Sequence, residues 1–227
     1  MTRQSFDREL QRLQDEVLAL GSMVEEALVN SVQQLKQRDF VGSKRLIAAD
    51  QDVNERRFAM EEDVLTLIAT QQPMARDMRL LAAVLEIITE LERIGDYAKG
   101  IARINLMIGE RPLVKPLIDL PIMAAKAREM LRLALKAFMD RDVELARAIP
   151  AMDDEIDALY EEINRELMAF IVRDTSLIEQ ANLLLWAAHN LERTADRVIN
   201  LCERVVFTVT GEMTELDSDY AGFGSLD

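Results

Sequence analysis

Apolar residues recur at alternating three- and four-residue steps along the first part of the chain. The stripe between residues 3 and 37 consists of Leu10, Leu13, Val17, Leu20, Val24, Leu28 and Leu35. This period predicts an amphipathic α-helix with one face toward a core. The pattern stops at Arg38-Asp39-Phe40, and two further helices are expected over about 41–70 and 73–108, the last opening at Pro73, which suits a first helical position.

The second half of the chain repeats the first. Helices are expected over about 120–139, 143–172 and 177–210, and Pro150 should kink the middle one or displace its start. Arg38-Asp39 corresponds to Arg141-Asp142 at an offset of 103 residues, whereas Leu91-Glu92-Arg93 corresponds to Leu191-Glu192-Arg193 at an offset of 100. The difference in length falls in a loop, where insertions are tolerated.

These elements predict an all-α protein made of two tandem antiparallel three-helix bundles related by the internal repeat. We expect bundles over 1–108 and 119–210, joined by a linker over 109–118 that contains one glycine and two prolines. Residues 211–227 hold five acids and no bases, without periodicity, and are expected to form a mobile acidic tail.

The charge of the chain restricts its partners. A formal net charge of −14, from 41 acidic and 27 basic residues, argues against nucleic acid, whose phosphates need a basic surface. The single cysteine, Cys202, excludes an internal disulfide and fits a small buried apolar residue. No signal-peptide core and no run of about 18 apolar residues is visible, so we expect a cytoplasmic protein without a membrane-spanning segment.

Carboxylates lie in one register beside the apolar seam of four helices. Heptads place acidic or amide side chains at the e and b positions, four residues apart and therefore about 6 Å apart on a helix. The four pairs are Asp50 and Asn54, Glu92 and Asp96, Asp153 and Asp157, and Glu192 and Asp196. Most of these acids have no Lys or Arg three or four residues away, so their repulsion needs another cation or is tolerated on a solvated face.

A multivalent metal ion would relieve this repulsion, since carboxylate oxygens are hard ligands. Sites of this kind accept Mg, Mn, Fe or Zn according to geometry and supply. The only histidine, His189, could join the second-half site or be a partly exposed helix residue without that role. A di-iron oxidase of the ferritin type would need two Glu-x-x-His motifs, and no phosphate loop or nucleophile triad points to an enzyme.

Several of these residues carry a resemblance to the PhoU family that spans the chain to about residue 210. They are Met23-Val24-Glu25, the loop from Gln72 to Arg79, and the repeated Glu92-Arg93-Ile94-Gly95-Asp96 and Glu192-Arg193-Thr194-Ala195-Asp196. The resemblance implies a non-catalytic, negative regulator of phosphate uptake. Its expected partners are the phosphate ABC-transporter ATPase and a membrane sensor histidine kinase, and we expect a homodimer that reaches the inner membrane only through those partners.

The resemblance also implies metal, iron or zinc among the candidates, at the acid-x-x-x-Asp pairs. The implied ligands are Asp50, Glu92 and Asp96 in the first half, and Asp153, Asp157, Glu192 and Asp196 in the second. Asn54 departs from the acidic pattern, so the first site is expected to be weaker or empty. Two alternatives stay open: a carboxylate-bundle protein for metal storage or metal-dependent oxidation, and a structural helical protein whose acids only confer solubility.

Overall fold

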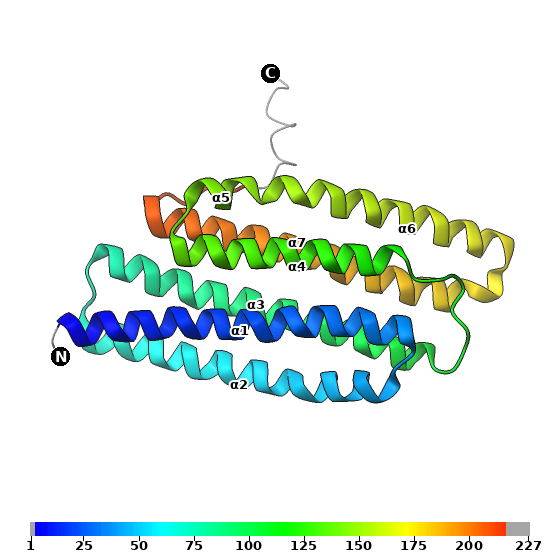
Figure 1. The fold of residues 1–227 in the computed structure, drawn as a ribbon, viewed down its shortest axis with the longest axis horizontal. Coiled ribbons are helices and arrows are strands. Elements are labelled where there is room, and N and C mark those ends of the chain that lie inside the picture. The colour runs from blue at the N-terminus through cyan, green and yellow to red at the C-terminus, as the bar shows by residue number, and fades with distance from the viewer. Residues whose placement is uncertain (1–2, 217–227) are drawn as a thin grey trace, which may run out of the picture.

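The computed structural model describes residues 3–216, and these fold into helices joined by short turns. The first half contains α1 (Arg3–Gln37), α2 (Phe40–Gln71) and α3 (Ala75–Ile108). The second half contains α4 (Asp119–Asp140), α5 (Val143–Ala148), α6 (Asp153–Arg173) and α7 (Ile178–Thr210), with single 3-10 turns at Pro150–Met152 and Thr175–Leu177. The two three-helix bundles lie side by side with their long axes aligned (Figure 1), which confirms the predicted fold class.

Pro150 divides the middle helix of the second bundle, as its position predicted. The proline stands at the start of a 3-10 turn, because it cannot donate the backbone hydrogen bond that would continue α5. The chain resumes α-helical structure at Asp153. The expected single helix over 143–172 is therefore two helices, α5 and α6, that together occupy the place of α2.

The predicted seams are buried. Leu13, Val17, Leu20, Val24 and Leu28 of α1 are all at most 1% exposed, and the seam of α7 from Leu184 to Val205 is equally buried. Burial of a leucine-sized side chain stabilises the folded state by about 1.5–3 kcal/mol, so these stripes account for why the helices pack.

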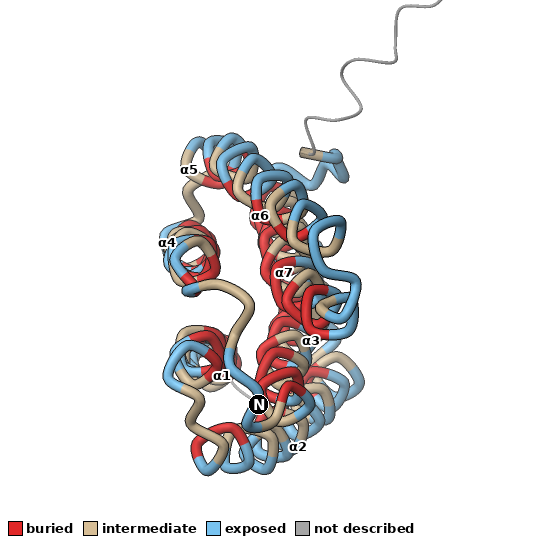
Figure 2. The backbone as a smooth tube through the Cα atoms, turned by 90° about the vertical axis from the view of Figure 1, so that its right-hand side faces the viewer, coloured by how far each residue is buried: buried red, intermediate tan, exposed pale blue. Residues whose placement is uncertain are grey.

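The bundles share one hydrophobic core. Helices α3 and α7 run antiparallel in contact, and α1 packs against α4, so that buried faces of both bundles meet in the middle (Figure 2). Polar contacts border the α3–α7 contact: Glu90 Oε2 lies 3.4 Å from Arg197 Nη1 and accepts a hydrogen bond from Asn200 Nδ2 at 3.2 Å. The two halves of the repeat thus share a continuous core, and the predicted bounds of the two bundles, 1–108 and 119–210, stay predictions.

Hydrogen bonds and ion pairs fix the connection between the bundles to the neighbouring helices. Gln180, which is 5% exposed, accepts from Val114 N at 2.6 Å and donates to Pro112 O at 2.9 Å. Lys115 pairs with Asp119 at 2.9 Å and also with Glu166. After α7 the chain leaves the helix at Gly211, and Leu216 N donates to Glu203 Oε1 at 3.0 Å. The remainder of the expected acidic tail, 217–227, lies outside the described residues.

We expect Gly42→Ala to lower the free energy of unfolding by about 1–2 kcal/mol, the usual contribution of an N-cap. Gly42 N donates to Oδ1 of Asp39, the N-cap of α2, at 2.8 Å, and a Cβ at position 42 would stand 2.4 Å from Asp39 Oδ2. Gly100→Ala is the matched control, since its Cβ would meet only the end of the Asn190 side chain. Urea unfolding of both variants is the measurement; equal effects would contradict this account.

Candidate functional site

The first acidic cluster lies between α2 and α3. Asp50 and Asn54 come from α2, Glu92 and Asp96 from α3, and Asn54 Nδ2 donates to Asp50 Oδ2 at 3.3 Å. The pKa of the Glu92 carboxyl is raised, first by burial and then by the charges of Asp96 and Asp50, with Arg57 acting in the opposite direction. The packing of α2 against α3 therefore brings together residues that are about 40 positions apart in the chain and that the heptad register had singled out.

A lysine occupies this first cluster. Lys99 Nζ lies 2.6 Å from Asp50 Oδ2 and 3.1 Å from Asp96 Oδ1. The Asp50 side chain is only 8% exposed and that of Lys99 19%, so the pair is largely withdrawn from water. Hydrogen bonding to Asp50 raises the pKa of Lys99 above its usual value, in spite of its partial burial. Lys99 therefore joins the two helices as the counter-ion of both carboxylates.

The second cluster lies between α6 and α7. The pKa of the Glu192 carboxyl is raised, first by burial, then by Asp196, and further by Asp157. These three acids from two helices thus face a common space, and Asp153 stands half-buried one turn before Asp157 on α6. Glu192 Oε2 is buried, and although His189 Nδ1 lies 3.0 Å away, the geometry between them is not that of a hydrogen bond.

His189 stands at the edge of the second cluster. Its Nδ1 atom lies 3.0 Å from Glu192 Oε2, which makes an ion pair when the imidazole is protonated, and its ring centroid lies 6.1 Å from that of Tyr160. The side chain is 49% exposed. Both sequence interpretations of His189 remain predictions, because it is half-exposed and yet adjacent to a candidate ligand.

The clusters flank the contact between the bundles. Arg193, next to Glu192 in the chain, lies 3.7 Å from Asp196 Oδ2, and hydrogen bonding to Tyr97 of α3 raises its pKa. Tyr97 follows Asp96 of the first cluster. A side-chain contact between the bundles thus runs from the neighbourhood of one cluster to that of the other.

The residues of the two clusters fit a metal ion unequally. Across residues 3–216, no three His, Cys, Asp or Glu side chains converge closely enough to hold one in this arrangement. The second cluster offers hard carboxylate donors, among them a buried Glu192 oxygen that lies 3.0 Å from His189 Nδ1 without hydrogen-bond geometry, and these donor types fit a metal ion. In the first cluster the same kinds of oxygen already bind Lys99.

Sequence reasoning missed Lys99 as a partner of Asp50, because it compared charges only along each helix. Lys99 reaches Asp50 from the neighbouring helix, 49 positions away. The repeat contained one signal of this contact. At the offset of 100 that aligns α3 with α7, Lys99 corresponds to Ile199, so the first half has a positive charge where the second has an apolar side chain.

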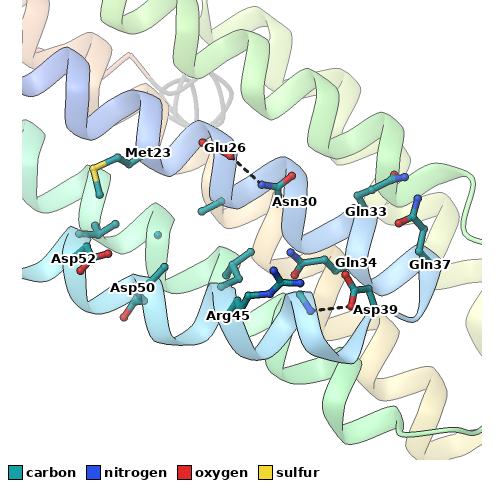
Figure 3. A pocket seen from close by; sticks show the side chains of 16 residues that line it. Met23, Glu26, Asn30, Gln33, Gln34, Gln37, Asp39, Arg45, Asp50 and Asp52 are labelled. Carbon is teal, nitrogen blue, oxygen red and sulfur yellow. Dashed lines mark hydrogen bonds between the residues drawn. The ribbon is translucent and has the colours of Figure 1, made fainter.

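A groove of about 560 Å³ runs between α1 and α2 and ends beside the first cluster, where Asp50 and Gly95 line it. Figure 3 shows Asn30, Gln33, Gln34 and Gln37 following one side of α1 along this groove. The offset of 103 pairs its small residues with larger ones in the second half: Ala27 with Met130, Gly42 with Leu145, and Ala49 with Met152. Smaller side chains thus line the first-half groove.

In metal-free protein, we expect the free energy of unfolding to rise as the pH falls from neutral toward the ordinary glutamate pKa of about 4.3. Glu92 and Glu192 have raised pKa values in the folded state, so the folded protein binds protons at these carboxyls more tightly than the unfolded chain. The gain begins at the raised pKa values and is complete below the unfolded value of about 4.3. Urea unfolding of Glu192→Gln should show a smaller rise than wild type, and an unchanged pH profile would contradict the assignment.

Within residues 3–216, no helix is both long and apolar enough to cross a lipid bilayer.

Comparison with known proteins identifies the repeat. The PhoU domain matches the chain twice, over residues 17–104 and 120–205, which are the two bundles. The phosphate-specific transport system accessory protein PhoU of Escherichia coli is 33% identical, with 98% of this chain and 90% of that protein covered, and a PhoU homolog of Clostridium acetobutylicum is 33% identical over 96% of this chain and its whole length.

Solved structures agree with this match. The crystal structure of PhoU from Pseudomonas aeruginosa has a TM-score of 0.86 at 28% identity and covers 91% of this chain and all of that one. The phosphate transport system regulatory protein PhoU from Streptococcus pneumoniae has a TM-score of 0.85 at 30% identity, covering 92% and 99%. The chain belongs to the PhoU family.

Proposed function

We propose that the protein is a non-catalytic cytoplasmic regulator of phosphate homeostasis, which restrains the phosphate ABC importer and phosphate-starvation signalling when phosphate is plentiful. The observation that carries the proposal is the match of both bundles to the PhoU domain, with relatives named as accessory and regulatory proteins of phosphate transport. These names support a role in phosphate transport. That the protein restrains uptake and signalling is our own proposal.

The proposed mechanism is binding, through helix surfaces, to the transporter ATPase and to a membrane sensor histidine kinase, with the protein acting as a homodimer. A regulator shifts the population of a partner only if it binds two states of that partner with different affinity. Large side chains at the surface support protein contact: Phe58 and Leu65 on α2 are 59% and 52% exposed, and Trp186 on α7 is 63% exposed.

Deletion of the gene tests the regulatory proposal. Phosphate-starvation genes should be derepressed in phosphate-rich medium, and expression at the wild-type level would refute it. Co-purification of the tagged protein from membranes that carry the transporter and kinase tests the partners. Glu61→Arg with Leu65→Ser on α2 should weaken capture if that surface is used, whereas Arg132→Glu, at an exposed site on α4, serves as a charge-changed control.

We further propose that the second cluster binds a divalent or trivalent metal ion, with Asp153, Asp157, Glu192 and Asp196 as its ligands. Bound metal would offset the repulsion among these carboxylates and tie α6 to α7. Metal content of protein purified without chelator is the measurement. The double variant Glu192→Ala with Asp196→Ala should lose this metal, and unchanged stoichiometry would count against the ligands.

The alternative function is a carboxylate-bundle protein for metal storage or metal-dependent oxidation. It is favoured by the contact of His189 with Glu192, since imidazole and carboxylate together suit iron. Repeated consumption of ferrous iron and oxygen by the purified protein would support oxidation. Tight metal binding without turnover would favour the regulatory proposal.

A further inference from the structure

The two acidic clusters differ at two corresponding positions. The offset of 103 aligns Asn54 with Asp157, and the offset of 100 aligns Lys99 with Ile199. The first cluster therefore has an amide and an ammonium group where the second has a carboxylate and an apolar side chain. Ile199 is 5% exposed, so no side-chain cation stands at its position in the second half.

Lys99 binds the oxygens that a metal would use in the first cluster. Asp50 Oδ2 accepts a hydrogen bond from Lys99 Nζ at 2.6 Å and a longer one from Asn54 Nδ2 at 3.3 Å, and Asp96 Oδ1 lies 3.1 Å from the same ammonium nitrogen. A metal ion would have to displace this ammonium group and leave it in a partly buried place next to a second positive charge. Such an arrangement is strongly unfavourable at low exposure.

The local charge is also nearly balanced without metal. Asp50, Glu92 and Asp96 carry three negative charges; Lys99 opposes two of them directly, and Arg57 lowers the pKa of Glu92. In the second cluster, Arg193 Nε lies 3.7 Å from Asp196 Oδ2, and the half-exposed imidazole of His189 lies 3.0 Å from Glu192 Oε2. The first cluster therefore already contains a cation that contacts two of its three carboxylates, and it needs none from outside.

We infer that Lys99 is the resident cation of the first cluster and excludes metal from it, so that each chain binds metal in its second half only. This inference rests on the proposed metal binding by the second cluster. It assigns different roles to the two halves of the repeat: an ion pair joins α2 to α3, and a replaceable metal ion joins α6 to α7.

Reciprocal exchange of the differing residues tests the inference, with Mn²⁺ as the probe. Chelator-treated full-length chain is dialysed against Mn²⁺, and bound metal is measured by elemental analysis and by the EPR signal of free Mn²⁺. The variant Glu92→Ala with Asp96→Ala should bind as much Mn²⁺ as wild type. The variant Glu192→Ala with Asp196→Ala should bind none. Ile199→Lys, which installs the missing ammonium, should weaken Mn²⁺ binding at least tenfold.

The opposite exchange should create a site. Lys99→Ile with Asn54→Asp should double the Mn²⁺ stoichiometry, and Mn²⁺ should raise the melting temperature of this variant by more than it raises that of wild type. Lys99→Arg is the matched control, because it preserves the positive charge and should bind no additional metal. Far-UV circular dichroism confirms that each variant is folded.

Two results would overturn the inference: loss of metal from Glu92→Ala with Asp96→Ala, or no additional Mn²⁺ in the folded Lys99→Ile, Asn54→Asp variant. Failure of the proposed metal function is distinguishable from these. If wild type bound no Mn²⁺, the second cluster would not be a metal site, yet uptake by the Lys99→Ile, Asn54→Asp variant would still establish that Lys99 excludes metal from the first. If Lys99→Ile with Asn54→Asp does not fold, the paired alanine variants decide the question.

Discussion

Replacing Asn105 with Val should lower the free energy of unfolding by about 3 kcal/mol, the sum of lost hydrogen bonds and of buried groups left unsatisfied. Asn105 is fully buried on α3, and its Nδ2 atom lies 2.9 Å from Ser43 Oγ and 3.2 Å from both Gln34 O and Asp39 O. Its Oδ1 atom accepts from Arg38. This single side chain fastens the turn between α1 and α2 to the end of α3.

The repeat supplies the control for this prediction. Val205 and Ala146 stand in the second half where the first has Asn105 and Ser43. The double variant Asn105→Val with Ser43→Ala removes the orphaned hydroxyl group and should recover part of the loss, since replacing both partners of a buried hydrogen bond costs less than replacing one. Urea denaturation of the three proteins is the measurement. Equal stability of wild type and Asn105→Val would refute the role given to Asn105.

Met60→Ala should destabilise both bundles together, by about 3 kcal/mol for a large buried side chain. Met60 is fully buried on α2, and α2 packs mainly against α1 and α3 of its own bundle. Because the two bundles share one core, the loss should also appear at Cys202 on α7, as a thiol-labelling rate about 100-fold higher than in wild type.

Cys202 is a suitable reporter for this experiment. Burial raises the pKa of its thiol to about 12, so that very little thiolate exists near neutral pH in the folded state. Labelling therefore reports opening of the second bundle. Met60→Leu is the matched control, since it nearly conserves volume and should change the rate little. A destabilised Met60→Ala protein with the wild-type labelling rate would show that the bundles unfold independently.

The fold was predictable because its signals are local. The steps of three and four residues located α1 within a residue at each end, and the equivalent residues of the two halves predicted the repeat that the two PhoU-domain matches confirm. The sharing of a core was not predictable from these patterns. A seam shows which face of a helix is buried, whereas the contact of α3 with α7 depends on how the two bundles are placed in space.

The membership of the candidate site stays a prediction, and the structure adds a contact that the sequence did not reveal. Heptad register identified which carboxylates stand beside the seams, and the pKa shifts of Glu92 and Glu192 agree that these groups are crowded. The partner of Asp50 is on another helix, so charge spacing within α2 could not reveal it. Metal binding itself remains a proposal for the experiments above.

The break at Pro150 has a consequence for the second cluster. Because helical structure resumes at Asp153, this carboxylate stands at the N-terminus of α6, whereas its counterpart Asp50 lies within the continuous helix α2. Aligned peptide dipoles give a helix N-terminus a partial positive charge that stabilises an anion, typically by about 0.3–1 kcal/mol. The helix backbone thus offsets part of the negative charge of the second cluster, as Lys99 does in the first. It does so without binding any carboxylate oxygen.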